Sequence, residues 1–214
     1  MTRKLLIFEL LMIAVAIVVT VFLLPQLPPR VATHWGMNGQ PNGFSPKNAL
    51  WIFGPGLLVF ILLLGALMPW LSPHRFSIEN FRSTYNFILL AVFLLMAYCY
   101  AIILWTATGL HIDVARFVIG AVCLLIAAIG NVLGKVRQNF YVGVRTPWTL
   151  SNERVWHATH RFAAKCFVVA GLLGLAMAMI GAQIVPIVVI LVGAFAPVIY
   201  SLVFYKQLEH RGEL

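Results

Sequence analysis

Apolar runs of roughly twenty residues recur along the chain, and shorter polar segments separate them. Each run is long enough to cross, as a helix, the hydrocarbon core of a membrane, which is about 30 Å thick. The pattern therefore predicts an all-α membrane protein with six transmembrane helices. The predicted spans are residues 5–24, 50–71, 85–105, 114–133, 162–180 and 184–203.

The first long polar break, residues 25–48, reads PQLPPRVATHWGMNGQPNGFSPKN. Proline fixes φ, while Asn and Gly tolerate positive φ, so this composition is typical of defined turns rather than of a flexible linker. Residues 31–35 are expected to form a short strand. The turn of the resulting β-hairpin would lie at Asn38-Gly39 or at Asn42-Gly43.

The second long break is an insert at residues 134–165, and it carries six of the fifteen Lys and Arg residues. Ser151 or Asn152 can cap a new helix there, with Glu153 in its first turn, where the helix dipole favours an acid. This helix would continue into the fifth span. Its basic face is expected either to hold anionic headgroups or to bind a partner. The residues on that face are Arg154, His157, Arg161 and Lys165.

Only 10% of the residues are charged, whereas soluble domains have about 25%. If six spans place both termini on one side, twelve of the fifteen Lys and Arg residues fall on that side, and only Arg30, Lys47 and Arg116 face the other. The positive-inside rule then puts both termini and the insert in the cytoplasm, and residues 25–48 outside. The net charge of +9 is therefore explained by cytoplasmic loops that lie beside membrane lipids and are rich in Lys and Arg. No direct binding of nucleic acid is predicted.

The two polar breaks also suggest a domain division. Residues 1–71 would form a two-span N-terminal unit that carries the outer loop. Residues 84–206 would form a four-span unit that carries the cytoplasmic insert. At the end of the fourth span, Gly130 and Gly134 form a G-x-x-x-G pattern that permits close helix approach.

Catalytic motifs are weak in this sequence. Glu153, His157 and His160 are spaced four and three apart and could converge on one metal ion, but the H-E-x-x-H pattern and a fourth ligand are missing. Ser151 beside a histidine has no G-x-S-x-G context. We therefore predict no enzyme, no catalytic residue, no bound metal and no cofactor.

An alternative function remains open at this point. Glu9 lies inside the first span, and an ionisable group in a span is a functional hypothesis by default, although this one could also reach headgroups. A small membrane transporter or a metal-dependent membrane enzyme would use Glu9, His34 or His160.

Two stretches resemble a known family. VGVRTPWTLSNERVWHATHRFAAKCFVVAGL, residues 142–172, closely resembles the signature of the SdpI family of bacterial immunity proteins. LPPRVATHWGMNGQPNGFSPK, residues 27–47, resembles the loop that commonly precedes that signature. The loop pattern is carried by His34, Trp35, Gly39, Pro41 and Gly43.

The resemblance implies a multi-pass protein of the bacterial cytoplasmic membrane. The best-known family member protects a cell against its own secreted toxin peptide, and it also acts in signal transduction by drawing a small DNA-binding repressor to the membrane. By resemblance, the expected partners are a secreted toxin peptide outside and a repressor protein inside. The match does not carry over the identity of the toxin.

The resemblance also proposes residues for binding the ligand or the partner, because they match the family pattern. Thr149 and Lys165 match the pattern as well. His34 and Trp35 could equally be structural residues of the loop. The predicted binding residues are His34, Trp35, Asn139, Gly143, Arg145, Thr146, Pro147, Trp148, Ser151, Glu153, Trp156 and His160.

Overall fold

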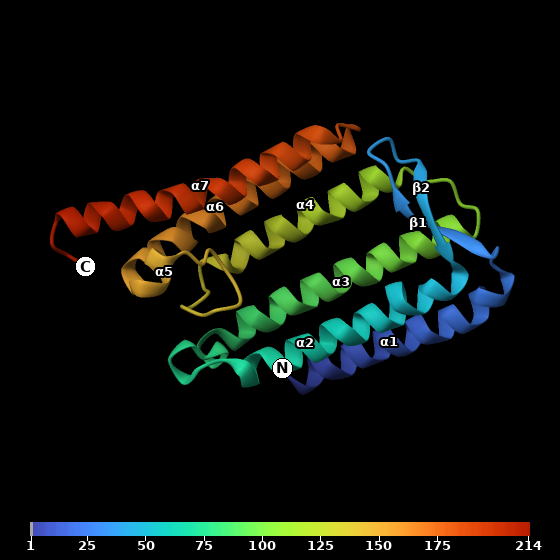
Figure 1. Ribbon diagram of the computed structural model, residues 1–214, viewed down its shortest axis with the longest axis horizontal. Coiled ribbons are helices and arrows are strands. Elements are labelled where there is room, and N and C mark those ends of the chain that lie inside the picture. Colours follow the sequence, from blue (N-terminus) through green and yellow to red (C-terminus); the bar gives the residue numbers. More distant parts are fainter. Residues whose placement is uncertain (1) are drawn as a thin grey trace. The chain divides into compact units, whose positions relative to one another are not determined.

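The protein is described here from a computed structural model, which covers residues 2–214 apart from the side chain of Arg75. It is built from long helices and one small hairpin (Figure 1). The helices are α1 Arg3–Leu23, α2 Leu57–Leu71, α3 Arg82–Ala107, α4 Val114–Leu133, α5 Pro147–Ser151, α6 Glu153–Met179 and α7 Ile184–His210. The strands are β1 Arg30–Trp35 and β2 Pro41–Pro46.

Six helical segments in the described residues are long and apolar enough to cross a membrane, which confirms the predicted six-span, all-α membrane protein. Their mean hydropathy lies between 2.0 and 2.9. As predicted, the helix of the insert and the fifth span form one continuous helix, α6. The six spans are Arg3–Gln26, Lys47–Leu71, Ile78–Ala107, Val114–Leu133, Glu153–Met179 and Ile184–His210.

The chain divides into two compact units. Unit 1 comprises Met1–Leu67 and Leu89–Val118, and unit 2 comprises Met68–Ile88 and Ile119–Leu214. Helices α2, α3 and α4 each contribute to both units. The division into a two-span unit and a four-span unit suggested by the sequence stays a prediction.

Unit 1 has an apolar core that contains one hydrogen-bonded polar pair. The Thr20 hydroxyl donates to the Ala16 carbonyl at 2.5 Å and lies 2.6 Å from the Tyr100 hydroxyl, which donates to it in turn. The Tyr100 ring packs over Gly54, where a Cβ would overlap it. The apolar residues around this pair include Ile13, Leu27, Val31, Leu50, Leu58, Phe93 and Leu104.

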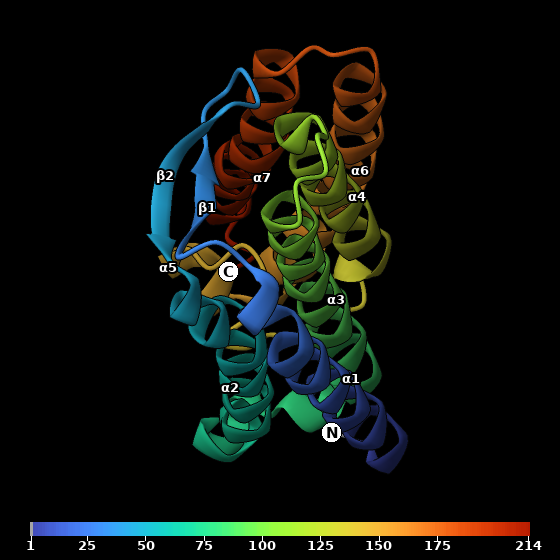
Figure 2. The same cartoon turned by 90° about the vertical axis from the view of Figure 1, so that its right-hand side faces the viewer.

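The predicted hairpin is confirmed, and Figure 2 shows its two antiparallel strands. Arg30 pairs with Pro46 at the base of the hairpin, and Trp35 pairs with Pro41 beside the turn. Gly39 has a φ of 72°, so the turn lies at Asn38-Gly39, one of the two predicted positions. The other predicted position, Asn42-Gly43, lies within β2.

Close helix packing in unit 2 depends on small residues. A Cβ on Gly130 would lie 2.7 Å from the Val168 nitrogen of α6, so only glycine fits where α4 meets α6. A Cβ on Gly134 would lie 3.9 Å from the nearest atoms, which is ordinary contact. Of the predicted G-x-x-x-G pair, Gly130 therefore makes the close approach. Helix α7 runs beside α6 (Figure 1).

Candidate functional site

The insert starts with a turn that is held by one amide side chain. Asn139 is fully buried, and its Oδ1 accepts hydrogen bonds from the N–H groups of Tyr141 at 2.7 Å and Val142 at 2.8 Å. Its Nδ2 donates to the carbonyls of Arg137 at 2.7 Å and Val142 at 3.0 Å. These four bonds use the hydrogen-bonding capacity of the amide. Asn139 thus shapes the loop rather than presenting a free group to a ligand.

The buried His160 ring closes the same loop onto α6. The N–H of Val144 donates to Nε2 at 3.1 Å, and Nδ1 lies 2.8 Å from the Trp156 carbonyl. A ring nitrogen that accepts carries no proton, so Nδ1 carries the proton and donates to that carbonyl. Gly143 has a φ of 115°, and a Cβ there would overlap Nε2. Both nitrogens are therefore engaged by the backbone, and neither is free to bind a metal.

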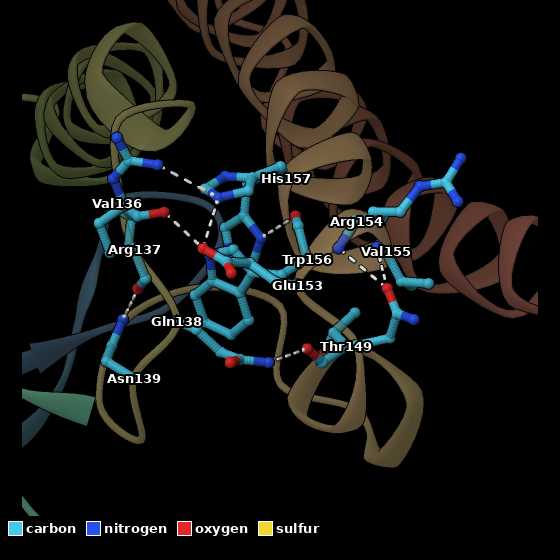
Figure 3. A network of polar contacts seen from close by, with 12 residues as sticks. Val136, Arg137, Gln138, Asn139, Thr149, Glu153, Arg154, Val155, Trp156 and His157 are labelled. Carbon is cyan, nitrogen blue, oxygen red and sulfur yellow. Dashed lines mark hydrogen bonds and ion pairs between the residues drawn. The ribbon is translucent and has the colours of Figure 1, made fainter. Parts of the chain in front are cut away.

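Trp156 ties the start of the insert to α6. Its side chain is fully buried, and its Nε1–H donates to the Val136 carbonyl at 2.8 Å. The indole also stacks on the His160 ring with 4.0 Å between centroids. Figure 3 shows this part of the network around Val136, Asn139 and Trp156.

The short helix α5 is fixed at its first turn. Thr146 is the N-cap, and its Oγ1 accepts from the Thr149 N–H at 3.3 Å while Thr149 Oγ1 accepts from the Thr146 N–H at 2.9 Å. Pro147 occupies the first helical position, where its missing N–H has no cost. Gln138 donates to the carbonyls of Thr149 and Leu150, each at 2.8 Å.

Trp148 joins α5 to the last span. Its indole Nε1–H donates at 2.5 Å to the hydroxyl of Ser201, a buried residue of α7. Ser201 in turn donates to the Val198 carbonyl at 2.6 Å. In the sequence, Ser201 stands out only as a small polar residue within an apolar span. Nothing there links it to Trp148, which is 53 residues away.

The structure shows which of the two predicted residues, Ser151 or Asn152, caps α6. Asn152 Oδ1 accepts from the N–H groups of Arg154 at 2.9 Å and Val155 at 3.2 Å, so Asn152 is the N-cap. Ser151 is exposed, and its hydroxyl donates to the Trp148 carbonyl at 3.2 Å.

The three-ligand metal hypothesis is not supported by the geometry. His157 Nε2 lies 3.3 Å from a Glu153 oxygen and 3.2 Å from the Arg137 guanidinium, all near the surface (Figure 3). His160 is buried and bonded to backbone groups on both sides of its ring. Across the part of the chain that the structure describes, no three His, Cys, Asp or Glu residues gather as a metal site would require.

We call the hydrogen-bonded cluster of the insert the clasp. Its members are Val136, Gln138, Asn139, Gly143, Val144, Thr146, Thr149, Trp156 and His160. Of the predicted binding residues of the insert, Gly143, Arg145, Pro147, Ser151 and Glu153 are exposed. The Arg145 guanidinium donates to the Phe140 carbonyl. Sequence reasoning missed the backbone carbonyls that complete the clasp, because any residue type supplies them.

The predicted residues of the outer loop lie in two different surroundings. His34 is exposed, and its Nδ1 lies 2.5 Å from the Asn42 Oδ1 across the hairpin. Trp35 instead lines a cavity of about 620 Å³ between the hairpin and residues 106–113. We call this cavity the hairpin hollow. Its lining includes Arg30, Trp35, Gln40, Phe44, His111 and Asp113.

Glu9 is the third residue that the sequence suggested for a transporter or a membrane enzyme, beside His34 and His160. Only 2% of it is exposed, and its Oε2 has no hydrogen-bond partner. It lies in α1, whereas His34 is on β1 and His160 is in the clasp.

Two parts of the chain match known protein families. Residues 135–201 match a family model described as the SdpI/YfhL protein family. This part of the chain is similar to that family. The matched range contains all of the clasp, and its last residue is Ser201, the acceptor of Trp148. Residues 11–63, which include the hairpin, match a domain of unknown function, DUF1648.

A similarity also extends along almost the whole chain. The immunity protein SdpI of Bacillus subtilis (strain 168) is 24% identical over 209 residues, which are 95% of this chain and 97% of that protein. No solved structure matches the chain significantly. Six apolar helices together with this family place the protein in the cytoplasmic membrane as a multi-pass protein.

Proposed function

We propose that this protein gives a bacterial cell immunity to a secreted peptide toxin. The observation that carries this proposal is the similarity to an immunity protein along 95% of the chain. The similarity includes both the loop with the hairpin and the insert with the clasp, so it is not confined to apolar spans that any membrane protein shares.

The hairpin hollow is the proposed binding place for the toxin. The charge asymmetry of the loops supports an extracytoplasmic position for residues 25–48, where a secreted peptide arrives. Trp35 and Phe44 offer aromatic surface, and Arg30 offers a cation, within a cavity large enough for a few side chains. Aromatic and arginine side chains in a pocket are the usual anchors of peptide binding. We therefore expect a peptide that presents apolar side chains and a carboxylate.

A receptor role would use the exposed face of the insert. A second cavity, of about 540 Å³, is lined by Asn80, Arg137, Gln138, Ser151 and Glu153. Its polar lining is suited to a cytoplasmic protein such as a repressor. Recruitment would require that the toxin bind one conformation of the chain better than another, since only such a difference shifts a population.

Protection can be tested in cells. A sensitive bacterial host would express either this chain or an empty vector, and both would be exposed to the peptide fraction of culture supernatant from the organism that carries this gene. We expect the chain to raise the growth-inhibiting concentration at least tenfold. Equal inhibition with and without the chain would contradict the immunity proposal.

The chain offers a matched pair of variants for the binding place. Phe44 is 50% exposed and lines the hairpin hollow, whereas Met37 is 47% exposed on the same hairpin and lies outside the lining. Phe44→Ala should lose most of the protection, and Met37→Ala should keep it. If both variants protect like the wild type, the toxin binds elsewhere.

The alternative, a small transporter or membrane enzyme, has one observation in its favour, the buried Glu9 with an unpartnered oxygen. A carboxyl group inside a span is typical of proton or ion pathways. Proteoliposomes with the wild type and with Glu9→Gln distinguish this function. A proton or ion flux that Glu9→Gln abolishes would favour transport over immunity.

A further inference from the structure

A third cavity lies in unit 2. It measures about 690 Å³ and is bordered by α4, α6 and α7. Its lining contains three cations and no acidic residue. The residues that line it are Asn131, Gly134, Lys135, Ala158, Arg161, Phe162, Ala164, Lys165 and Tyr200.

No partner for the three cations of this cavity is found among the described residues. Across the described residues, neither a carboxylate within 4.0 Å nor a side-chain hydrogen bond is found for Lys135, Arg161 or Lys165. By contrast, Arg154 on the same helix pairs with Glu213 at 2.9 Å, and Lys206 on α7 pairs with Glu209 at 2.7 Å. Three unpaired cations around one cavity create a local potential that favours an anion.

The cavity is positioned at the edge of the membrane span. Lys135 lies two residues after the end of α4, and Asn131 lies one turn earlier on that helix. On α6, Arg161 and Lys165 are one turn apart, so they face the same side. From residue 166 onward α6 continues without a charged residue to its end. The cations therefore lie where lipid headgroups meet the hydrocarbon.

The remaining wall of the cavity is apolar. Phe162 of α6 stacks on Tyr200 of α7 with 4.6 Å between ring centroids. Ala158 and Ala164 add small apolar surface on α6. An inorganic phosphate ion would need only the cations, whereas a phospholipid would also use an apolar wall beside its glycerol and acyl groups.

We propose that this cavity is a specific site for an anionic phospholipid. Lys135, Arg161 and Lys165 bind the phosphate group, Asn131 is placed to hydrogen-bond a headgroup hydroxyl, and the Phe162–Tyr200 pair packs against the acyl chain. Basic cavities between helices at the cytoplasmic side of a membrane recognise lipid headgroups by this combination. The site is independent of toxin binding, so the immunity proposal can fail while this one holds.

The test measures lipid binding to the full-length chain in a neutral detergent. Phosphatidylglycerol, phosphatidylcholine or inorganic phosphate is titrated, and bound ligand is counted by native mass spectrometry together with the shift in unfolding temperature. The site variant is Lys135→Gln/Arg161→Gln/Lys165→Gln. The control, Arg3→Gln/Lys4→Gln/Arg211→Gln, removes the same charge from exposed cations for which the described residues offer no carboxylate partner.

We expect phosphatidylglycerol to bind the wild type and the control with similar affinity. The site variant should bind it on the order of 100-fold more weakly, from the loss of three cation–phosphate interactions. An Arg161→Lys/Lys165→Arg variant keeps the charges and should bind like the wild type, which controls for folding.

Three results would overturn the proposal. If the site variant and the control lose the same affinity for phosphatidylglycerol, the lipid is attracted by overall charge and not by this cavity. Equal stabilisation by inorganic phosphate and by phosphatidylglycerol would make the ligand a free phosphate. Equal binding of phosphatidylcholine would remove any preference for an anionic lipid.

Discussion

The clasp and the hairpin hollow use similar residues in opposite ways. In the clasp, Asn139, Trp156 and His160 are fully buried, and each polar atom of the three side chains has a backbone partner. In the hairpin hollow, Trp35, Asn38 and His111 line a cavity instead. The same types of side chain thus hold the fold in one region and face a cavity in the other.

This difference changes the interpretation of the family signature. A motif rich in Trp, His, Asn and Thr was expected to bind a ligand or a partner. Its buried members instead connect the end of α4, the helix α5 and the start of α6 through hydrogen bonds. Substitutions in the clasp should therefore act on stability first, whereas substitutions in the hairpin hollow should act on toxin binding with little effect on stability.

Gly143→Ala should have the largest effect on stability. The new Cβ would overlap the His160 ring, break its two hydrogen bonds and strain a backbone with positive φ. We expect a loss of about 3 kcal/mol or more in the free energy of unfolding, measured by denaturation in detergent micelles.

Gly109→Ala is the matched control for this variant. Gly109 has a φ of 91°, but a Cβ there would meet nothing within 4 Å. Only the strain of a positive φ destabilises this variant, so its free energy of unfolding should fall by about 1 kcal/mol. Equal losses in the two variants would show that the contact with His160 contributes nothing.

The bond between Trp148 and Ser201 should have an intermediate effect. Trp148→Phe, Ser201→Ala and the double variant form a cycle that isolates the contact between α5 and α7. We expect a coupling energy of about 1 kcal/mol, as for a neutral hydrogen bond. Additive effects of the two substitutions would mean that α5 is held by the clasp alone.

Arg154→Ala should have the smallest effect. The guanidinium pairs with Glu213 at 2.9 Å, but the two side chains are 60% and 39% exposed. Exposed ion pairs contribute about 0.5 kcal/mol or less. A loss above about 1.5 kcal/mol on unfolding in micelles would show that the C-terminal tail is a structural part of unit 2.

Much of the fold followed from the sequence because apolar length and turn chemistry are local signals. The six spans, the hairpin with Asn38-Gly39 as one of two possible turns, and the continuity of the insert with the fifth span were all predicted. Glycine at a turn and an acid after a cap act within a few residues, so their pattern is visible in the chain.

The sites were less predictable because their partners are distant or belong to the backbone. Trp148 was identified as important, but its acceptor Ser201 is 53 residues away. His160 looked like a possible ligand until the structure placed Val144 and Trp156 backbone groups at its two nitrogens. The hairpin hollow takes one wall from residues 106–113, which the sequence showed only as a short turn.

The most direct test compares two tryptophans, Trp156 of the clasp and Trp35 of the hairpin hollow, in one set of assays. Trp156→Phe should lower the free energy of unfolding by about 2 kcal/mol, because it leaves the Val136 carbonyl without its donor, and it should still protect cells while folded. Trp35→Ala should change stability by less than about 1 kcal/mol and lose protection against the toxin fraction. The account is contradicted if Trp35→Ala protects fully while a stably folded Trp156→Phe does not.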